Sequence, residues 1–158
     1  MSWQRGRARV DELLASGELE HVMPAPNLAD RLVEEARRHL ASAQAIAASD
    51  PTGAYQLAYD CARKACAALL AAQGLRATTR GGHIAVQDTV IAQFGGKGGI
   101  AAFGALPRLR RSRAASEYPN ADSPTVTEED ANDAITSASD ILAAVRRIFD
   151  AGRLEPMR

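Results

Sequence analysis

The sequence predicts an all-α protein, built as an up-and-down bundle of four to five helices with a short N-terminal helical extension. Alanine accounts for 33 of the 158 residues, whereas aromatic residues make up only 4%. This composition favours closely packed helices over a β-sandwich or a β-barrel. Apolar residues recur at the spacing of an α-helix in several segments, and no segment alternates apolar and polar residues clearly enough to predict a strand.

Polar residues, glycine and proline mark where the helices start and stop. Asp50 followed by Pro51 predicts an N-cap and the first residue of a helix, and Gly74 predicts its end. Thr127 and Asp130 resemble a capping box at the start of the last helix. We therefore expect helices over about residues 9–16, 28–48, 51–73, 83–94 and 128–149, and a short one from Leu106 or Arg108 to Glu117.

The length of the chain indicates one domain with short additions. We expect an N-terminal extension with a short helix over residues 1–26, the helical bundle over 27–150 and a C-terminal tail over 151–158. The first residues, with Trp3 and several arginines, do not resemble a signal peptide, and no apolar run reaches the length of a membrane span. These features predict a cytoplasmic protein that does not interact with a membrane.

Neither a metal nor a cofactor is expected. Cys61 and Cys66 lie five residues apart in a predicted helix, on different faces, and have no histidine cluster near them. His83 follows two glycines at a helix start, where a surface or capping role is the simpler interpretation. Lys97 lies in a glycine-rich segment, but Gly98 follows it where a phosphate-binding loop requires Ser or Thr, so this segment is interpreted as a linker.

Arginines are concentrated in one short segment of an otherwise neutral chain. Nineteen basic and nineteen acidic residues cancel, so no overall charge attracts nucleic acid. Four arginines nevertheless fall within six residues, a cluster that suits phosphate or an acidic partner. An alternative is that they pair internally with Glu128, Glu129 and Asp130 in the first turn of the last helix. The candidate RNA- or phosphate-binding residues are Arg108, Arg110, Arg111 and Arg113.

Three features occur in an order that a known family shares. The first is an alanine-rich, lysine-bearing helix over residues 54–74 that ends in Gln-Gly. The second is Gly82-His83 at the start of the next helix, and the third is the Arg-x-x-x-Glu-Tyr element over residues 113–118. In these features, over about residues 28–149, the sequence resembles HEPN domains, which are helical bundles of bacterial toxin–antitoxin and defence systems. The arginine-rich segment that ends in Glu-Tyr-Pro resembles an actinobacterial subgroup.

The resemblance implies a compact bundle, usually a homodimer, that is related to HEPN toxins. In active members of the family, an Arg-x(4–6)-His motif from each subunit meets at the dimer cleft and cleaves RNA without a metal. The Arg would stabilise the scissile phosphate, and the His would act as acid or base on the 2′-hydroxyl. Some members pair with a nucleotidyltransferase antitoxin that modifies a Tyr two residues after that His.

This sequence departs from the motif because no His follows the arginine cluster. In one register, Arg113 takes the Arg place and Tyr118 the His place. In the other, Arg111, Ser116 and Tyr118 take the Arg, His and modifiable Tyr places. A tyrosine with its ordinary pKa of about 10 is a poor general base at neutral pH. The candidate catalytic residues are Arg113, Tyr118 and Glu117.

Three functions remain open from the sequence. The first is a degenerate or non-catalytic HEPN module that binds RNA, a nucleotide or a partner protein, with Tyr118 stacking on a base. The second is a metal-independent endoribonuclease toxin with an Arg/Tyr site at the dimer cleft. The third is a purely structural helical dimer. The missing His favours the first.

Overall fold

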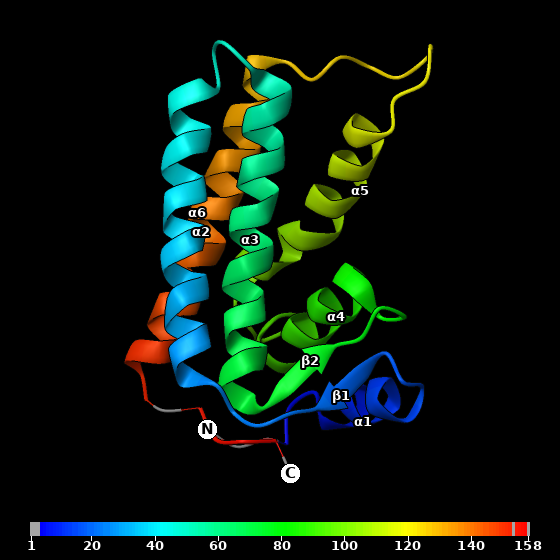
Figure 1. The fold of residues 1–158 in the computed structure, drawn as a ribbon, viewed down its shortest axis with the longest axis vertical. Helices are drawn as coiled ribbons and strands as arrows, with labels where there is room; N and C mark the ends of the chain where they lie inside the picture. Colours follow the sequence, from blue (N-terminus) through cyan, green and yellow to red (C-terminus); the bar gives the residue numbers. More distant parts are fainter. Residues whose placement is uncertain (1–3, 153, 158) are drawn as a thin grey trace.

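The computed structural model describes residues 4–152 and 154–157 and confirms a mostly helical protein. Residues 1–3, 153 and 158 of the expected extension and tail, Trp3 among them, lie outside the described residues. The elements follow one another as shown in Figure 1. They are α1 (Arg7–Ala15), β1 (Leu19–His21), α2 (Pro26–Ile46), α3 (Pro51–Gln73), β2 (Leu75–Ala77), α4 (Gly82–Phe94), the 3-10 helix η1 (Ala101–Ala105), α5 (Leu106–Glu117) and α6 (Glu128–Asp150).

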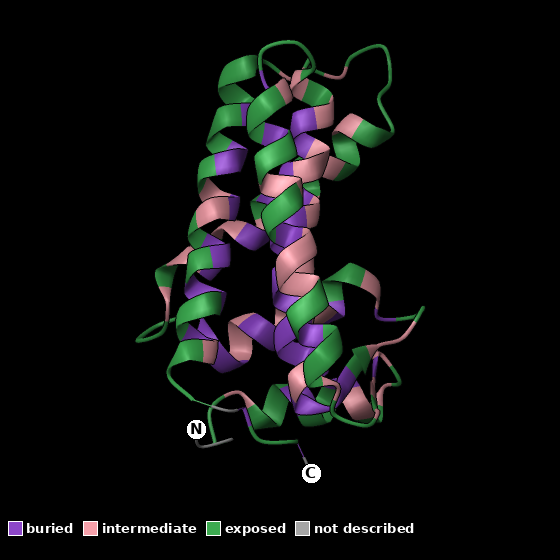
Figure 2. Ribbon diagram, turned by 60° about the vertical axis from the view of Figure 1, so that its left-hand side comes forward, coloured by how far each residue is buried: buried purple, intermediate pink, exposed green. Residues whose placement is uncertain are grey.

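The three long helices α2, α3 and α6 lie side by side and enclose an alanine-rich core (Figures 1 and 2). The central helix is α3, which packs against α2, α4, α5 and α6. Its many alanines allow neighbouring helices to approach closely, which explains why apolar residues occupy more than one face of its sequence. In the described part of the chain, no helix is long and apolar enough to cross a membrane.

The predicted helix signals are confirmed in atomic detail. The Asp50 carboxylate accepts a hydrogen bond of 2.9 Å from the Gly53 amide, and Gly74 ends α3 in the left-handed conformation with φ of 73°. At the start of α6, the Thr127 side chain accepts from the Asp130 amide at 3.1 Å, and the Asp130 carboxylate accepts from the Thr127 amide at 2.9 Å. These are the two reciprocal bonds of a capping box.

The expectation that the chain has no strand is wrong. β1 and β2 form a two-stranded antiparallel sheet in which Leu19 pairs with Ala77 and His21 with Leu75. Each strand has only three residues, which is too short for an alternating pattern to stand out in a sequence. The pairing instead depends on tertiary packing, because β1 follows α1 whereas β2 follows α3.

The N-terminal residues pack onto the end of the bundle that is lowermost in Figure 1. Val10 and Leu13 of α1 are buried in the same core as the bundle residues, and α1 packs against α4. Arg9 forms an ion pair of 2.7 Å with Asp88 of α4. The N-terminal residues also hold the glycine-rich segment around Lys97, because the Arg5 guanidinium donates to the carbonyl of Gly98 at 3.1 Å.

A 3-10 helix that the sequence pattern did not predict sets the direction of α5. Phe103 of η1 is fully buried, and its ring lies 6.4 Å from the ring of Phe94 at the end of α4. α5 leaves η1 along the upper half of α3 (Figure 1) and buries Leu106 and Leu109. The arginine-rich helix is therefore anchored at its first turns, and its later turns carry the candidate site.

Candidate functional site

Arg113 lies against α3 and contacts three side chains. Its Nε donates to the Gln56 side-chain oxygen at 3.0 Å, and its guanidinium is paired with the Glu117 carboxylate one turn along α5. Its guanidinium carbon also lies 5.5 Å from the centre of the Tyr59 ring, a cation–π geometry. Arg113 is therefore held in place on two helices.

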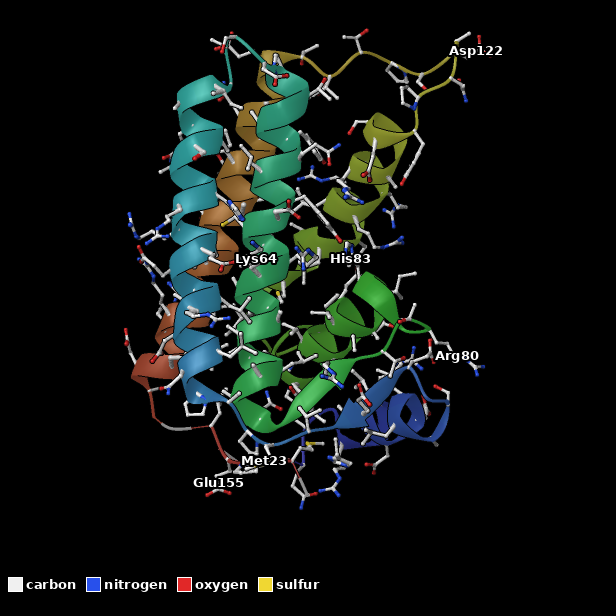
Figure 3. All side chains as sticks on the ribbon, in the orientation of Figure 1. Met23, Lys64, Arg80, His83, Asp122 and Glu155 are labelled. Carbon is white, nitrogen blue, oxygen red and sulfur yellow. The ribbon has the colours of Figure 1, made fainter. Side chains whose placement is uncertain are left out.

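Tyr59 joins Arg113 to a histidine from a third helix. The Tyr59 hydroxyl and His83 Nδ1 are 3.0 Å apart, within hydrogen-bond distance, and the two rings lie 5.7 Å apart. His83 stands in the first turn of α4 and remains accessible to solvent (Figure 3). The segment that follows Arg113 contains no histidine, but the imidazole of His83 lies near Arg113 in the folded protein. The sequence signal for it, Gly82-His83 at a helix start, did not indicate this position.

Two further arginines complete a cationic cluster. Arg63 lines a small cavity beside Tyr59 and His83. The Arg110 Nε is buried without a hydrogen-bond partner among the described residues. The positive charges of Arg63, Arg110 and Arg113 all act on the Tyr59 hydroxyl. We call Arg63, Arg110 and Arg113 the α3–α5 arginine cluster. Three guanidinium groups whose charges converge on one hydroxyl form a favourable place for an anion.

The surroundings shift the pKa values of the two aromatic partners in opposite directions. Burial raises the pKa of the Tyr59 hydroxyl above its usual value, although the neighbouring arginines partly oppose this shift. Burial, assisted by the charges of Arg63 and Arg113, lowers the pKa of His83. At neutral pH, Tyr59 therefore keeps its proton and His83 is uncharged. This pair can donate and accept hydrogen bonds but adds no negative charge to the cluster.

The other predicted site residues point in different directions. Tyr118 caps the end of α5 with 78% of its surface exposed, and the tyrosine that lies under Arg113 is Tyr59. Ser116 lies between the two helices, because its hydroxyl donates to the Arg113 carbonyl at 2.9 Å and accepts from Gln56 at 3.0 Å. Arg111 is exposed to solvent. Of the four predicted arginines, Arg110 and Arg113 thus approach α3.

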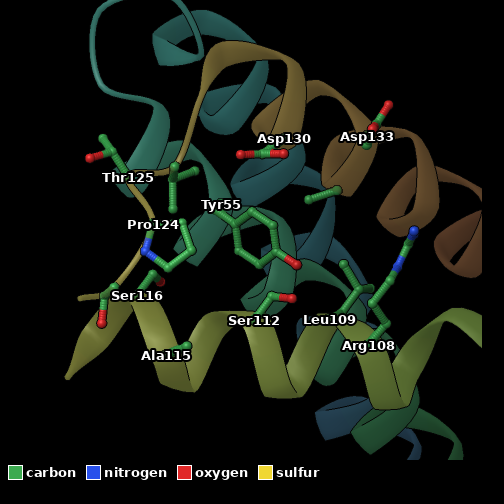
Figure 4. Close-up of a pocket in the computed structure, with 13 residues that line it drawn as sticks. Tyr55, Arg108, Leu109, Ser112, Ala115, Ser116, Pro124, Thr125, Asp130 and Asp133 are labelled. Atoms are coloured by element: carbon green, nitrogen blue, oxygen red, sulfur yellow. The ribbon is translucent and has the colours of Figure 1, made fainter. Parts of the chain in front are cut away.

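Arg108 faces α6 across a second cavity. Its guanidinium donates to the Ser137 hydroxyl at 3.3 Å. The cavity, of about 350 Å³, separates α5 from α6 and from the loop that precedes α6. Figure 4 shows the Tyr55 ring inside it and Asp133 on the wall opposite Arg108. Within the described residues, no arginine of α5 forms an ion pair with Glu128, Glu129 or Asp130, which was the alternative that the sequence left open for the arginine cluster.

Lys64 on the central helix is already engaged. Its Nζ lies 2.8 Å from the Glu35 carboxylate and 2.8 Å from His39 Nε2, both on α2 (Figure 3). Burial and the Lys64 charge lower the pKa of His39, so this imidazole accepts the hydrogen bond from the ammonium. These contacts of Lys64 tie α2 to α3.

The described residues contain no group of three His, Cys, Asp or Glu side chains that could hold a metal ion. Cys61 and Cys66 are both buried as free thiols in α3. Burial raises the pKa of Cys61 to about 12 and also raises the pKa of Cys66. The thiolate form that binds metals or attacks substrates is therefore disfavoured at both positions.

Comparison with known proteins identifies one family. The model of the HEPN domain family matches residues 29–148, which is most of the chain and includes α3, α4, α5 and nearly all of α6. Searches of curated proteins and of solved structures give no match.

Proposed function

Because this chain belongs to the HEPN domain family, we propose that it is a non-catalytic RNA- or nucleotide-binding module of a toxin–antitoxin or defence system. The observation that supports this proposal is the α3–α5 arginine cluster around Tyr59 and His83, with the unpartnered Nε of Arg110. Guanidinium groups match the geometry of phosphate oxygens and remain charged at every physiological pH. The ligand is therefore expected to place a phosphate against Arg110 and Arg113.

The ion pair between Arg113 and Glu117 does not block such a ligand. About a third of the Glu117 side chain is exposed, so the carboxylate can rotate into solvent when a phosphate arrives. Gln56 and the Tyr59 ring still hold the Arg113 guanidinium after this exchange. The site is thus partly organised before the ligand binds, which lowers the conformational cost of binding.

The geometry supports binding more strongly than cleavage at Arg113 and Tyr118. Tyr118 is largely exposed, and the buried Tyr59 hydroxyl keeps its proton. A second candidate function, metal-independent RNA cleavage, is favoured by one observation: His83 supplies an imidazole near Arg113. Acid–base catalysis by this imidazole would replace the His that the Arg-x(4–6)-His motif lacks.

The proposal includes the partners that the family resemblance implies. These are a second copy of the chain, in a cytoplasmic homodimer, and a nucleotidyltransferase-type antitoxin that would modify Tyr118. The Tyr118 side chain is exposed beyond the last turn of α5, so its hydroxyl is accessible to such an enzyme.

The decisive experiment measures binding and cleavage together. Fluorescently labelled single-stranded RNA is titrated with the wild type and with Arg113→Ala in EDTA, and the products are separated on a denaturing gel. We expect the wild type to bind intact RNA and the variant to bind at least about tenfold more weakly, because a charge-assisted hydrogen bond contributes about 1.5–3 kcal/mol. The slope of binding against salt should also decrease by about 0.7 for the lost phosphate contact.

Arg147→Ala is the matched control, because Arg147 is exposed on α6 and its replacement removes the same charge. Equal loss of binding in both variants would show that only overall charge matters, and the site would be wrong. RNA cleavage by the wild type that is lost in Arg113→Ala would show that the protein is a nuclease and not a non-catalytic binding module. Absence of both binding and cleavage would contradict the proposal.

RNA binding is expected to strengthen as the pH falls. His83 is neutral at pH 7.5 because its pKa is lowered in the free protein, and a bound phosphate favours its protonated form. Ligand and proton binding are therefore coupled, and affinity should rise between pH 7.5 and 5.5 by at most about tenfold per pH unit. Fluorescence anisotropy on wild type and His83→Gln measures this dependence. An identical pH profile in the variant would exclude His83 from the phosphate site.

A further inference from the structure

An apolar groove lies next to the arginine cluster on the face of α3 that α5 leaves uncovered. Its cavity volume is about 460 Å³, and α2, α3, β2 and α4 all contribute to its lining. The floor is formed by Ala67, Leu70 and Ala71 of α3. Leu28 and Leu32 of α2 form one wall, and Val86 of α4 contributes to the other. We call this surface the α2–α4 groove.

The rim of the groove exposes apolar side chains to an unusual degree. Met23 is 87% exposed and Leu28 is 39% exposed, and they account for two of the four large apolar side chains that the described surface exposes. Met23 projects at the base of the bundle in Figure 3. Adjacent exposed apolar side chains around a concave apolar floor are typical of a surface that another molecule covers.

The rim is also rigid. The segment between β1 and α2 is held by backbone hydrogen bonds of 2.9 Å from the Val22 amide to the Gly74 carbonyl and of 2.9 Å from the Ala25 amide to the Ala71 carbonyl. Pro26 then begins α2. The backbone that carries Met23 is therefore held in place, and the rim of the groove is organised before a ligand binds.

The described ends of the chain are occupied elsewhere. The α1 helix packs against α4, and the C-terminal residues Leu154 and Met157 are buried in the core. The Met157 amide donates to the Gln73 carbonyl at 2.8 Å. The described termini are thus already engaged in contacts with the bundle, and neither of them covers the groove.

The two charged residues that line the groove, Arg63 and Arg76, are both basic. The other polar side chains of the lining are Thr78 and the uncharged imidazole of His83. Arg76 is satisfied by Glu20 at 2.7 Å, whereas the ion pair of Arg63 with Asp60 is long, at 3.4 Å. Arg63 therefore keeps most of its capacity to bind a carboxylate, and its position places that carboxylate where the groove meets the arginine cluster.

We propose that the α2–α4 groove binds an amphipathic helix of a partner protein that carries acidic residues beside its apolar face. The lining residues of α3, at positions 63, 67, 70 and 71, form one helical stripe, and the alanines in it permit close approach of a second helix. Leucine-type side chains at helical spacing would fill the space between α2 and α4, and a glutamate at the edge would meet Arg63. This interaction goes beyond the proposed RNA function, although its site borders the arginine cluster and shares Arg63 and His83 with it.

The test uses two synthetic helical peptides of about 16 residues with the same leucine stripe. One carries Glu on both flanks of the stripe, and the other carries Lys at the same positions. By fluorescence anisotropy, we expect the Glu peptide to bind with a dissociation constant of about 10–100 μM and the Lys peptide to bind at least about tenfold more weakly. Equal affinity for both peptides, or no binding of the Glu peptide, would overturn the proposal.

Ala67→Glu places a charge and extra bulk on the floor and should weaken binding of the Glu peptide at least about tenfold, since the new carboxylate lies one helical turn from Arg63 and competes there with the glutamates of the peptide. Ala45→Glu, on an exposed position of α2, is the matched control and should retain the wild-type affinity. Met23→Glu at the exposed rim should weaken binding even if Ala67→Glu fails to fold. Undiminished binding to both groove variants would overturn the proposed site.

Two further measurements separate other occupants from the helix. Sedimentation of wild type and Ala67→Glu reports self-association, and a dimer that only this variant dissociates would make the occupant a second copy of the chain. RNA binding by Met23→Glu should equal that of the wild type, whatever the outcome for Arg113→Ala, because Met23 lies at the base of the bundle and not on the helical turn next to Arg63. A loss of RNA binding in Met23→Glu would assign the groove to RNA. Either of these results would overturn the proposal.

Discussion

Replacement of Phe103 by alanine is expected to lower the free energy of unfolding by about 3–5 kcal/mol. Phe103 is the largest side chain in the fully buried core and has no exposed surface. Its ring packs 6.4 Å from Phe94 where α4, η1 and α5 meet, so the replacement leaves a cavity that the short 3-10 helix cannot fill by moving. The loss is comparable with a large part of the stability of a typical domain.

Urea denaturation followed by circular dichroism measures this effect. Ile84→Ala is the control, because Ile84 is a large apolar residue with nearly half of its surface exposed, and its replacement should change stability by less than about 0.5 kcal/mol. Since η1 leads directly into α5, Phe103→Ala should also weaken RNA binding through the position of Arg113. Similar midpoints for Phe103→Ala and the wild type would show that η1 does not belong to the cooperative core.

Replacement of Gly74 by alanine is expected to cost about 2–4 kcal/mol of stability. A φ of 73° alone disfavours an L-residue by about 1–2 kcal/mol. An added Cβ would also lie 2.7 Å from the Val22 carbonyl oxygen, so the backbone between β1 and α2 would have to shift. This shift would break the hydrogen bond from the Val22 amide to the Gly74 carbonyl and would move the rim of the α2–α4 groove.

Thermal unfolding of Gly74→Ala and Gly104→Ala tests this explanation. A Cβ on Gly104 would meet no atom within 4 Å, and its φ is not positive. The Gly104 variant should therefore be neutral or more stable by about 0.4–1 kcal/mol, because it restricts the unfolded chain. Equal melting temperatures for the two variants would contradict the importance of the left-handed conformation at Gly74.

The helices were predictable because their signals are local. Asp50 and the pair Thr127 and Asp130 lie within one turn of the amide groups that they cap, so their role is visible in the sequence. The sheet between β1 and β2 gave no such signal, because each strand is short and its partner is distant along the chain. The 3-10 helix η1 was missed for a related reason, because it is positioned by the packing of Phe103 against Phe94 and not by a signal within its own segment.

The candidate site was predictable only in part. Arg113 stood out because four arginines cluster in its segment, whereas Tyr59, His83 and Arg63 resemble ordinary residues of α3 and α4. Tyr59 comes 54 positions before Arg113 in the sequence, and no pattern along the chain indicates that its ring lies under the Arg113 guanidinium. Sequence also could not distinguish Arg110, which approaches α3, from the neighbouring Arg111, which is exposed.

The order of amino acids is enough to predict a helical protein with defined helix ends, an arginine-rich helix before the last helix and a resemblance to HEPN domains. Those properties depend on neighbouring residues or on the order of segments, so they can be read without coordinates. The folded chain was needed to find which side chains surround Arg113, that His83 stands beside Tyr59 and that a groove remains open over α3. These features arise where helices cross, and the crossing is set by packing between residues that are far apart in the chain.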